Sequence, residues 1–172
     1  MSQFFAIHPD NPQARLLRKA ATIIEEGGLI VYPTDSGYAL GCALGNRQGV
    51  ERIRSLRQLS KNHNLTMVCR DLSDLGRFSK VSNPIFRLLK VFTPGPYTFI
   101  LNATHEVPKV MLHPKRKTLG LRVPENNIAL SLLETLEAPL MSSTLILPGA
   151  KAPLSEPEAI KDLLGERVDL IL

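Results

Sequence analysis

Residues 30–41, IVYPTDSGYALG, combine a short apolar run with a dense group of polar and turn-forming residues. Residues 30–32 are typical of a buried strand, and Pro33 is expected to end it because proline cannot donate to a sheet ladder. Two hydroxyls, a carboxylate and two glycines then follow, which is more polar chemistry than a plain surface turn needs. The stretch therefore suggests a strand that ends at a ligand-holding turn.

Segments typical of strands and helices alternate on both sides of this stretch. Strands are expected over residues 29–32, 65–69, 97–101, 118–123, 140–147 and 168–172. Helices are expected over residues 11–28, from near residue 46, from residue 83, over residues 127–136 and before residue 165. This alternation predicts an α/β fold with a twisted mixed sheet and flanking helices. No linker, repeat or low-complexity tract interrupts it, so we expect a single domain over residues 1–172.

Two helix starts carry the same local signal. The dipeptide Asn-Pro at residues 11–12 and again at residues 83–84 places an N-cap residue before a proline, which suits the first helical position. In the helix that begins at residue 83, helical spacing predicts that four apolar residues face inward. They are Ile85, Leu88, Leu89 and Phe92.

Composition narrows the class of protein. Hydrophobic residues make up 44% and charged residues 22%, as in an ordinary globular domain. The net charge of +5 favours anionic partners such as nucleotides or RNA. Aromatic residues are sparse at 5%, which disfavours a stacking platform for single-stranded bases. The two cysteines, Cys42 and Cys69, lie in apolar runs and are too few for a zinc site, so we expect buried thiols and no metal site.

The two ends of the sequence give further expectations. The first ten residues, MSQFFAIHPD, lack the basic start and long apolar core of a signal peptide. No stretch approaches the ~20 apolar residues that a membrane helix needs. The sequence therefore predicts a cytoplasmic protein. It ends on the strand-like residues VDLIL (168–172) without a following turn, which favours a further C-terminal segment beyond Leu172.

Four stretches together resemble the YrdC/YciO family: YPTDSGYALGC (32–42), TPGPYTFIL (93–101), TLGLRVP (118–124) and PLMSSTLILPG (139–149). They occur in the family's order and with similar spacing over most of the chain. HNLTMVCRDLSDL (63–75) and KRKTLGLRVP (115–124) resemble the YciO branch more than the synthases of the family. The resemblance implies a twisted α/β sheet with an open, concave, positively charged surface.

The better-known members of that family are threonylcarbamoyl-AMP synthases, which act in tRNA threonylcarbamoyladenosine modification. The resemblance thus implies L-threonine, bicarbonate and ATP as substrates, with Mg²⁺, in a nucleotidyltransferase reaction. A carbamate formed from bicarbonate and the amine of threonine attacks the α-phosphate of ATP and expels pyrophosphate. Because two anions must approach each other, fixed positive charge and hydrogen-bond donors would assist most.

By this resemblance, Thr34 and Ser36 would hold the amino acid at the carboxyl end of their strand, where ligands bind in open α/β sheets. Asp35 would cap the turn or meet an ammonium group. The alternative for these residues is an ordinary Asx or Ser/Thr turn without a ligand.

The segment after the second expected helix departs from the synthases, which carry a Lys-x-Arg pair that grips phosphate. Arg57 matches the lysine of that pair, but Leu59 stands in place of the arginine. Lys61 and His63 follow closely and are candidates to supply part of the lost charge, without the fork geometry of arginine. The alternatives are a solvated helix end for the cations and no catalytic role for the isolated histidine.

A second departure concerns the family's Ser-x-Asn element, which reads Ser142-Ser143-Thr144 here. Ser142 keeps the hydroxyl expected to bind nucleotide or substrate. Thr144 replaces an amide and loses its two-donor group, although a β-branched residue suits a strand. The alternative is a strand with ordinary hydroxyls.

Arg122 is retained in TLGLRVP. An arginine flanked by apolar strand residues must face an anion, a carboxylate or solvent, because unpaired burial is costly. We expect an anion-binding role, since guanidinium matches planar phosphate and carboxylate groups.

Lys115, Arg116 and Lys117 form a basic run before that strand, either a solvated loop or a contact to phosphate or RNA. Two functions follow from the whole pattern. One is a threonylcarbamoyl-AMP synthase-like enzyme. The other is a double-stranded RNA- or tRNA-binding module of the same fold without synthase activity, because double-stranded RNA is read mostly through shape and phosphates. A small-molecule binder with neither activity is a third possibility.

Overall fold

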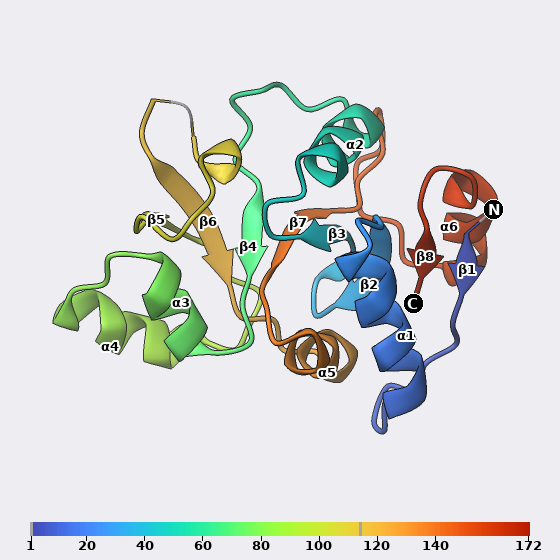
Figure 1. Cartoon of the computed structure of the whole chain (residues 1–172), viewed down its shortest axis with the longest axis horizontal. Helices are drawn as coiled ribbons and strands as arrows, with labels where there is room; N and C mark the ends of the chain where they lie inside the picture. The colour runs from blue at the N-terminus through green and yellow to red at the C-terminus, as the bar shows by residue number, and fades with distance from the viewer. Residues whose placement is uncertain (1, 114) are drawn as a thin grey trace.

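The computed structural model describes residues 2–113 and 115–172. Figure 1 labels the helices and strands along the chain. They are β1 (Gln3–Phe4), α1 (Ala14–Glu25), β2 (Ile30–Thr34), β3 (Gly37–Ala43), α2 (Arg47–Arg57), β4 (Thr66–Val68), α3 (Leu72–Phe78), α4 (Asn83–Phe92), β5 (Phe99–Asn102), the 3-10 turn η1 (Lys109–Met111), β6 (Thr118–Arg122), α5 (Asn127–Leu136), β7 (Leu140–Thr144), α6 (Pro157–Leu164) and β8 (Leu170–Ile171).

The strands form one mixed, eight-stranded sheet in the order β1-β8-β2-β3-β7-β4-β6-β5. At one side of the sheet, β8 runs parallel to both of its neighbours, β1 and β2. In the centre, β3 is antiparallel to β2 and to β7. β4 is antiparallel to β7 but parallel to β6, and β5 closes the far edge antiparallel to β6. This arrangement confirms the α/β fold with a mixed sheet that the sequence predicts.

The stretch at residues 30–41 forms the β2–β3 hairpin, and the prediction that Pro33 ends the strand is wrong. Pro33 lies within β2 and pairs with Tyr38 of β3. The carbonyl of Val31 accepts the Leu172 amide on the β8 side, and Pro33, two residues further on, faces the same way. Pro33 has no pairing partner on that side among the described residues, so its missing N–H breaks no ladder bond there.

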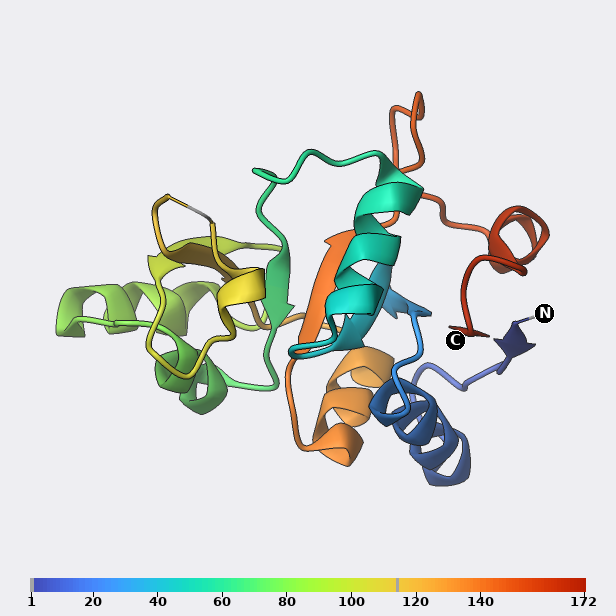
Figure 2. The same ribbon diagram turned by 45° about the horizontal axis from the view of Figure 1, so that its top comes forward.

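Apolar residues fill both faces of the sheet. α1 and α5 supply most of the helical part of one cluster and lie side by side in Figures 1 and 2. α2, α3, α4 and α6 contribute to the cluster on the opposite face. Cys42 and Cys69 are buried free thiols, as predicted, and burial raises the pKa of Cys42 to about 12.

The start of α1 differs from the prediction. The N-cap position is Gln13 and not Asn11. His8 explains the shift, because its Nδ1 accepts the amides of Asp10 at 3.2 Å and Asn11 at 3.1 Å and so holds these residues in a separate turn. None of the helices in the described ranges is long and apolar enough to cross a membrane.

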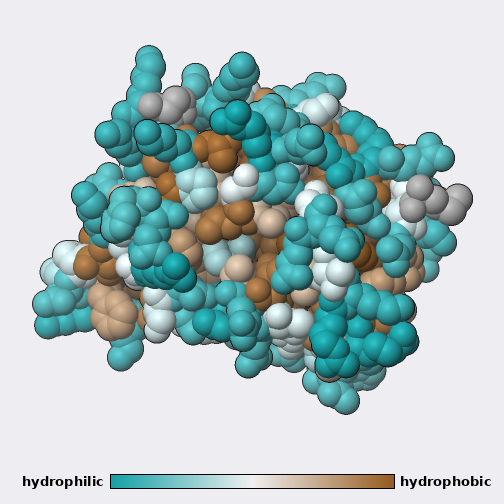
Figure 3. All heavy atoms as spheres, viewed as in Figure 1, coloured by the Kyte–Doolittle hydropathy of each residue, from teal (hydrophilic) through white to brown (hydrophobic). Residues whose placement is uncertain are grey.

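α4 also differs from the prediction, because its apolar residues do not all face inward. Leu89 is buried, whereas Leu88 is 52% exposed. Ile85 and Phe92 are only partly buried. Brown and tan atoms, which mark apolar residues, are visible on the surface around α3 and α4 at the left of Figure 3. α4 therefore packs along a narrow stripe, which helical periodicity alone does not predict.

Candidate functional site

The tip of the β2–β3 hairpin is held by its own polar groups. The Thr34 hydroxyl donates to the carbonyl of Gly37 at 2.6 Å and accepts from the amide of Ser36 at 3.2 Å. The hydroxyl of Ser36 lies 3.3 Å from the same oxygen. The Ser/Thr turn considered from the sequence is thus present. Because Thr34 donates its hydrogen to Gly37, Ser36 is the donor between the two hydroxyls, and both lone pairs of the Thr34 oxygen are used. Ser36 also accepts from Arg122 and keeps one lone pair for a ligand, whereas Thr34 would have to exchange a partner to bind one.

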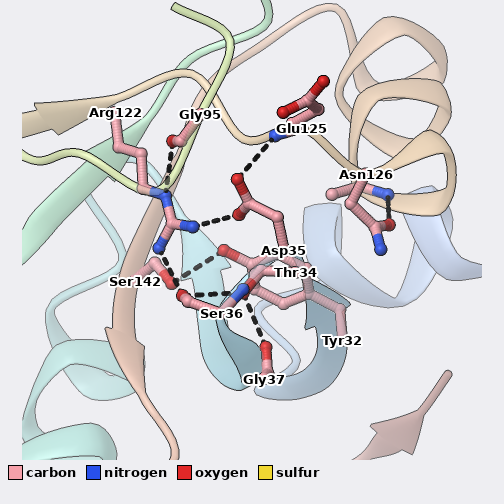
Figure 4. Close-up of polar contacts among 11 residues, drawn as sticks. Tyr32, Thr34, Asp35, Ser36, Gly37, Gly95, Arg122, Glu125, Asn126 and Ser142 are labelled. Carbon is pink, nitrogen blue, oxygen red and sulfur yellow. Dashed lines mark hydrogen bonds and ion pairs between the residues drawn. The ribbon is translucent and has the colours of Figure 1, made fainter. Parts of the chain in front are cut away.

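Arg122 is buried at the end of β6, where Asp35 from the hairpin tip meets its guanidinium (Figure 4). Nη2 pairs with one carboxylate oxygen of Asp35, Nη1 donates to the Ser36 hydroxyl at 2.8 Å, and Nε donates to the Gly95 carbonyl at 3.3 Å. The other oxygen of Asp35 accepts the Glu125 amide at 3.1 Å. The two side chains are 11% and 13% exposed, so this is a buried ion pair.

The pairing decides among the partners that the sequence left open for Arg122. The partner is a carboxylate of the chain itself, and the group that Asp35 meets is a guanidinium, not an ammonium. Because the pair is internally neutral, Arg122 offers no net charge to an anion while Asp35 stays in place. An anion bound here would have to share the guanidinium with Asp35.

Ser142 on β7 is buried and bonded on two sides. Its hydroxyl donates to the Leu40 carbonyl at 2.9 Å and lies 2.7 Å from the Tyr32 hydroxyl, which therefore acts as the donor in that bond. Burial raises the pKa of Tyr32 to about 12, against the opposing effects of the Ser142 hydrogen bond and the charge of Arg122. Tyr32 is thus neutral at ordinary pH, and Ser142 keeps one acceptor lone pair.

These groups surround a hollow of about 30 Å³ on the sheet surface, which we call the hydroxyl hollow. It has room for about two water molecules, so it can take the tip of a ligand but cannot enclose one. Its lining residues are Tyr32, Thr34, Ala39, Thr66, Val68, Thr98, Arg122, Pro124, Ser142, Ser143 and Thr144. Thr66 stands opposite Ser142 on one side and Gly120 on the other. A Cβ at Gly120 would come within 2.9 Å of Thr98 Cγ2, so glycine keeps this part open.

The lining residues that sequence reasoning did not select include the hydroxyl-bearing Tyr32, Thr66 and Ser143. Residues two apart on a strand share a face, and this rule would have added Tyr32 once Thr34 was chosen. Thr66 carries no such signal, because it reaches the site only through the pairing of β4 with β7.

Arg57 ends α2, on the opposite face of the sheet, and contacts the rim of the hydroxyl hollow through Ser143. Nη1 of Arg57 donates to the Ser143 hydroxyl, and Nε donates to the Ile146 carbonyl at 3.2 Å. Partial burial lowers the pKa of Arg57, but an arginine remains charged at neutral pH. No hydrogen bond joins Nη2 to any of the described residues, so this edge of the guanidinium is available to a ligand.

Lys61 and His63 lie in the exposed loop after α2 and do not line the hydroxyl hollow. Arg54 holds this loop by donating from Nη1 to the Lys61 carbonyl at 3.0 Å. Desolvation, and then the charges of Arg57 and Arg54, lower the pKa of His63. The histidine is therefore neutral at pH 7 and near enough to Arg57 to sense its charge.

The structure separates the basic run from the other predicted site residues. Lys115, Arg116 and Lys117 are exposed and precede the first residue of β6, whereas Arg122 is its last. A five-residue strand spans roughly 13 Å between its end residues. The hydroxyl hollow thus contains Thr34, Arg122, Ser142 and Thr144, with Ser36 and Arg57 bonded to its rim, but not the basic run.

The residues around the hydroxyl hollow do not fit a protein-held Mg²⁺. Asp35 at its rim uses both carboxylate oxygens for Arg122 and the Glu125 amide. Across the described ranges, no group of three His, Cys, Asp or Glu side chains is placed to hold a metal ion. We therefore assign no reaction step to a metal held by this chain.

Comparisons with known proteins match this sequence and fold. A protein-family model named Sua5_yciO_yrdC and described as Telomere recombination matches residues 22–172. The uncharacterized protein YciO of Escherichia coli (strain K12) is 57% identical over all 172 residues, which cover 84% of that protein. Its crystal structure superposes with a TM-score of 0.96 over 99% of this chain and 83% of that chain.

Two further relatives are more distant. A threonylcarbamoyl-AMP synthase of Nitrosococcus oceani is 32% identical over 157 residues, covering 91% of this chain and 84% of that protein. A structure of a P. abyssi Sua5 variant has a TM-score of 0.88 at 27% identity, covering 99% of this chain and 52% of that one.

Proposed function

The chain belongs to the Sua5/YciO/YrdC family, and from this premise we propose that it is an adenylate-forming enzyme of the threonylcarbamoyl-AMP synthase type. The observation that carries the proposal is the hydroxyl hollow, with Arg57 bonded to its rim through Ser143. Hydroxyls there can orient a small polar substrate, and a partly desolvated guanidinium beside them can hold a phosphate group.

The proposed reaction joins two anions. The amine of L-threonine and bicarbonate give a carbamate with loss of water. A carbamate oxygen then attacks the α-phosphorus of ATP, the α–β phosphoanhydride bond breaks, and pyrophosphate leaves with the electron pair. The chain would contribute hydrogen bonds from the hydroxyl hollow to the amino acid and N–H groups from Arg57 to the leaving phosphates. The product would serve the modification of tRNA.

Two features predict that this chain is a weaker synthase than a member that carries both the Lys-x-Arg pair and the Ser-x-Asn element. Leu59 removes the second cation expected in the phosphate grip, and Thr144 removes a two-donor amide. The neutral Arg122–Asp35 pair adds no net positive charge to compensate. Arg57, which reaches the rim of the hydroxyl hollow through Ser143 from the opposite face of the sheet, is thus the main unneutralised cation near it, and the proposal depends on it.

The test is the release of pyrophosphate from ATP by the full chain, with L-threonine and bicarbonate each left out in turn. We expect release only when both are present. Release that ignores either substrate, or no release at all, would contradict the proposal.

Substitutions in the hydroxyl hollow test whether the reaction takes place there. Thr144→Val keeps the shape of the side chain, and no hydrogen bond from the Thr144 hydroxyl to the described residues would be lost. We expect it to slow release roughly 3- to 10-fold, the value of one hydrogen bond. Thr34→Ala should also weaken threonine binding, measured by thermal shift, although its hydroxyl additionally holds the hairpin. Thr22→Val, on the exposed side of α1, is the matched control and should change neither.

A double-stranded RNA- or tRNA-binding role without synthase activity is the second candidate. The exposed side chains of Lys115 and Arg116 favour it. Binding through phosphates would weaken steeply with salt, and Thr144→Val would leave it unchanged.

A further inference from the structure

A second and larger pocket lies at the opposite end of β6 from the hydroxyl hollow, and we call it the basic pocket. Its volume is about 690 Å³, within the range of small-molecule sites in proteins. Its lining residues are Lys80, Ala103, Thr104, His105, Val107, Lys109, Leu112, His113 and Lys117. Apolar side chains thus form part of the wall beside three ammonium groups. Nothing in the proposed synthase reaction uses this pocket.

Backbone hydrogen bonds place two of the lysines on either side of one segment. The Lys80 amide donates to the Asn102 carbonyl at 2.8 Å. The Ala103 amide donates to the Lys117 carbonyl at 3.1 Å from the other side. The backbones of Lys80 and Lys117 are therefore about two strand spacings apart, roughly 10 Å, on opposite sides of that segment.

The charge of the basic pocket is not balanced within the chain. None of the described carboxylates forms an ion pair with Lys80, Lys109 or Lys117. The carboxylate of the nearby Glu106 pairs with Arg77 and not with these lysines. The pocket thus has a net positive charge.

His113 shapes the loop that carries Lys117. Its Nδ1 accepts the amides of Lys115 and Arg116, both at 3.2 Å. Nδ1 is therefore unprotonated, and Nε2 is the ring nitrogen that can donate. Lys117 adopts a left-handed backbone conformation with φ 53°, and its amide donates to the His113 carbonyl at 3.1 Å. These bonds hold the backbone of residues 115–117 against His113.

We propose that the basic pocket binds a small organic anion, a phosphate or carboxylate attached to an apolar or aromatic body. Three unpaired lysines would hold the anionic group, and Val107 and Leu112 would contact the body. The hollow shape and the apolar wall favour a small molecule over an RNA backbone, which needs an exposed basic surface but no apolar wall.

Heteronuclear NMR of the full chain tests this proposal with three probes that share one phenyl ring: phenyl phosphate, benzoate and the uncharged benzyl alcohol. We expect amide shifts at His105, Val107 and Lys117 and none at Thr34 or Arg57. The anions should bind about tenfold more tightly than benzyl alcohol, because several ammonium–anion contacts add. The ratio between phenyl phosphate and benzoate then tells which anionic group the pocket prefers.

Variants that each remove one positive charge test whether these lysines contribute to binding. Lys80→Gln and Lys117→Gln should each weaken phenyl phosphate roughly threefold, as expected for single exposed ion pairs. Lys19→Gln, exposed on α1, is the matched control and should change nothing. Equal affinity for benzyl alcohol, absence of shifts, or shifts confined to the hydroxyl hollow would overturn the proposal. So would a short RNA duplex that displaces phenyl phosphate at lower concentration with steep salt dependence.

Discussion

Positive charge is paired with a carboxylate at one end of β6 and has no described counter-charge at the other. At the end that lines the hydroxyl hollow, Arg122 is buried and its charge is cancelled by Asp35. At the other end, Lys117 and its neighbours in the basic pocket carry charge that no described carboxylate balances. Net charge alone therefore does not locate an anion site. The buried cation is mainly structural unless a ligand competes for it, whereas the exposed cations are available to any anion.

The largest expected effect comes from breaking the buried pair. Asp35→Ala leaves the guanidinium of Arg122 without its counter-charge, and we expect a loss of about 3–5 kcal/mol in the free energy of unfolding. Urea denaturation measures it. Glu106→Gln removes the partner of Arg77 near the basic pocket, where the side chains are 35% and 63% exposed, and should cost only about 0–1 kcal/mol. Equal losses for the two variants would contradict the contrast between the ends of β6.

The next effect concerns alkaline pH at the hydroxyl hollow. Burial raises the pKa of Tyr32 from 10.0 to about 12, so between these values the unfolded chain releases a proton that the folded chain keeps. The free energy of unfolding should therefore fall across this range, with a share of up to roughly 2–3 kcal/mol from Tyr32 that is fully present below pH 10.

Tyr32→Phe isolates that share, because the buried thiols titrate equally in both proteins. We expect the pH dependence above pH 10 to be shallower in the variant, measured by urea denaturation at successive pH values. Identical slopes would show that the Tyr32 hydroxyl ionises in the folded protein as it does in the unfolded chain.

The smallest effect is expected at Thr118, next to the basic pocket. Its hydroxyl is buried and has no hydrogen-bond partner among the described residues. Thr118→Val removes the unsatisfied group without changing its shape, so we expect stability to rise by up to about 1 kcal/mol. Ser142→Ala, which removes a hydroxyl with two partners, should instead cost about 1–3 kcal/mol. A loss at Thr118 similar to that at Ser142 would reveal a hydrogen bond there.

The fold could be predicted from the sequence because its signals are local. Residues 127–136 were predicted as a helix and form α5 with the same bounds. Asn46, near which the second helix was predicted to begin, caps α2 by accepting the Gly49 amide at 2.9 Å. Pro33 was misjudged because its tolerance depends on which side of β2 its backbone nitrogen faces, and that is a property of the sheet and not of the local sequence.

The candidate site could be predicted only in part, because its energetics depend on distant partners. The family resemblance indicated the hydroxyl-bearing residues Thr34, Ser142 and Thr144, and these three do line one hollow. The pairing of Arg122 with Asp35 joins positions 87 residues apart, so no spacing rule indicates it. The basic run at residues 115–117 was visible in the sequence, but two other lysines of the basic pocket, Lys80 and Lys109, come from other segments.

The position of β8 in the sheet has a consequence for biosynthesis. β1 pairs with β8 and β2 also pairs with β8, so, among the described residues, residues 3–4 join the sheet through residues 170–171 alone. During translation, residues 3–4 stay without their strand partner until residues 170–171 have left the ribosome. Closure of this edge thus follows the synthesis of residues 170–171, while the β2–β3 hairpin can form earlier from neighbouring residues.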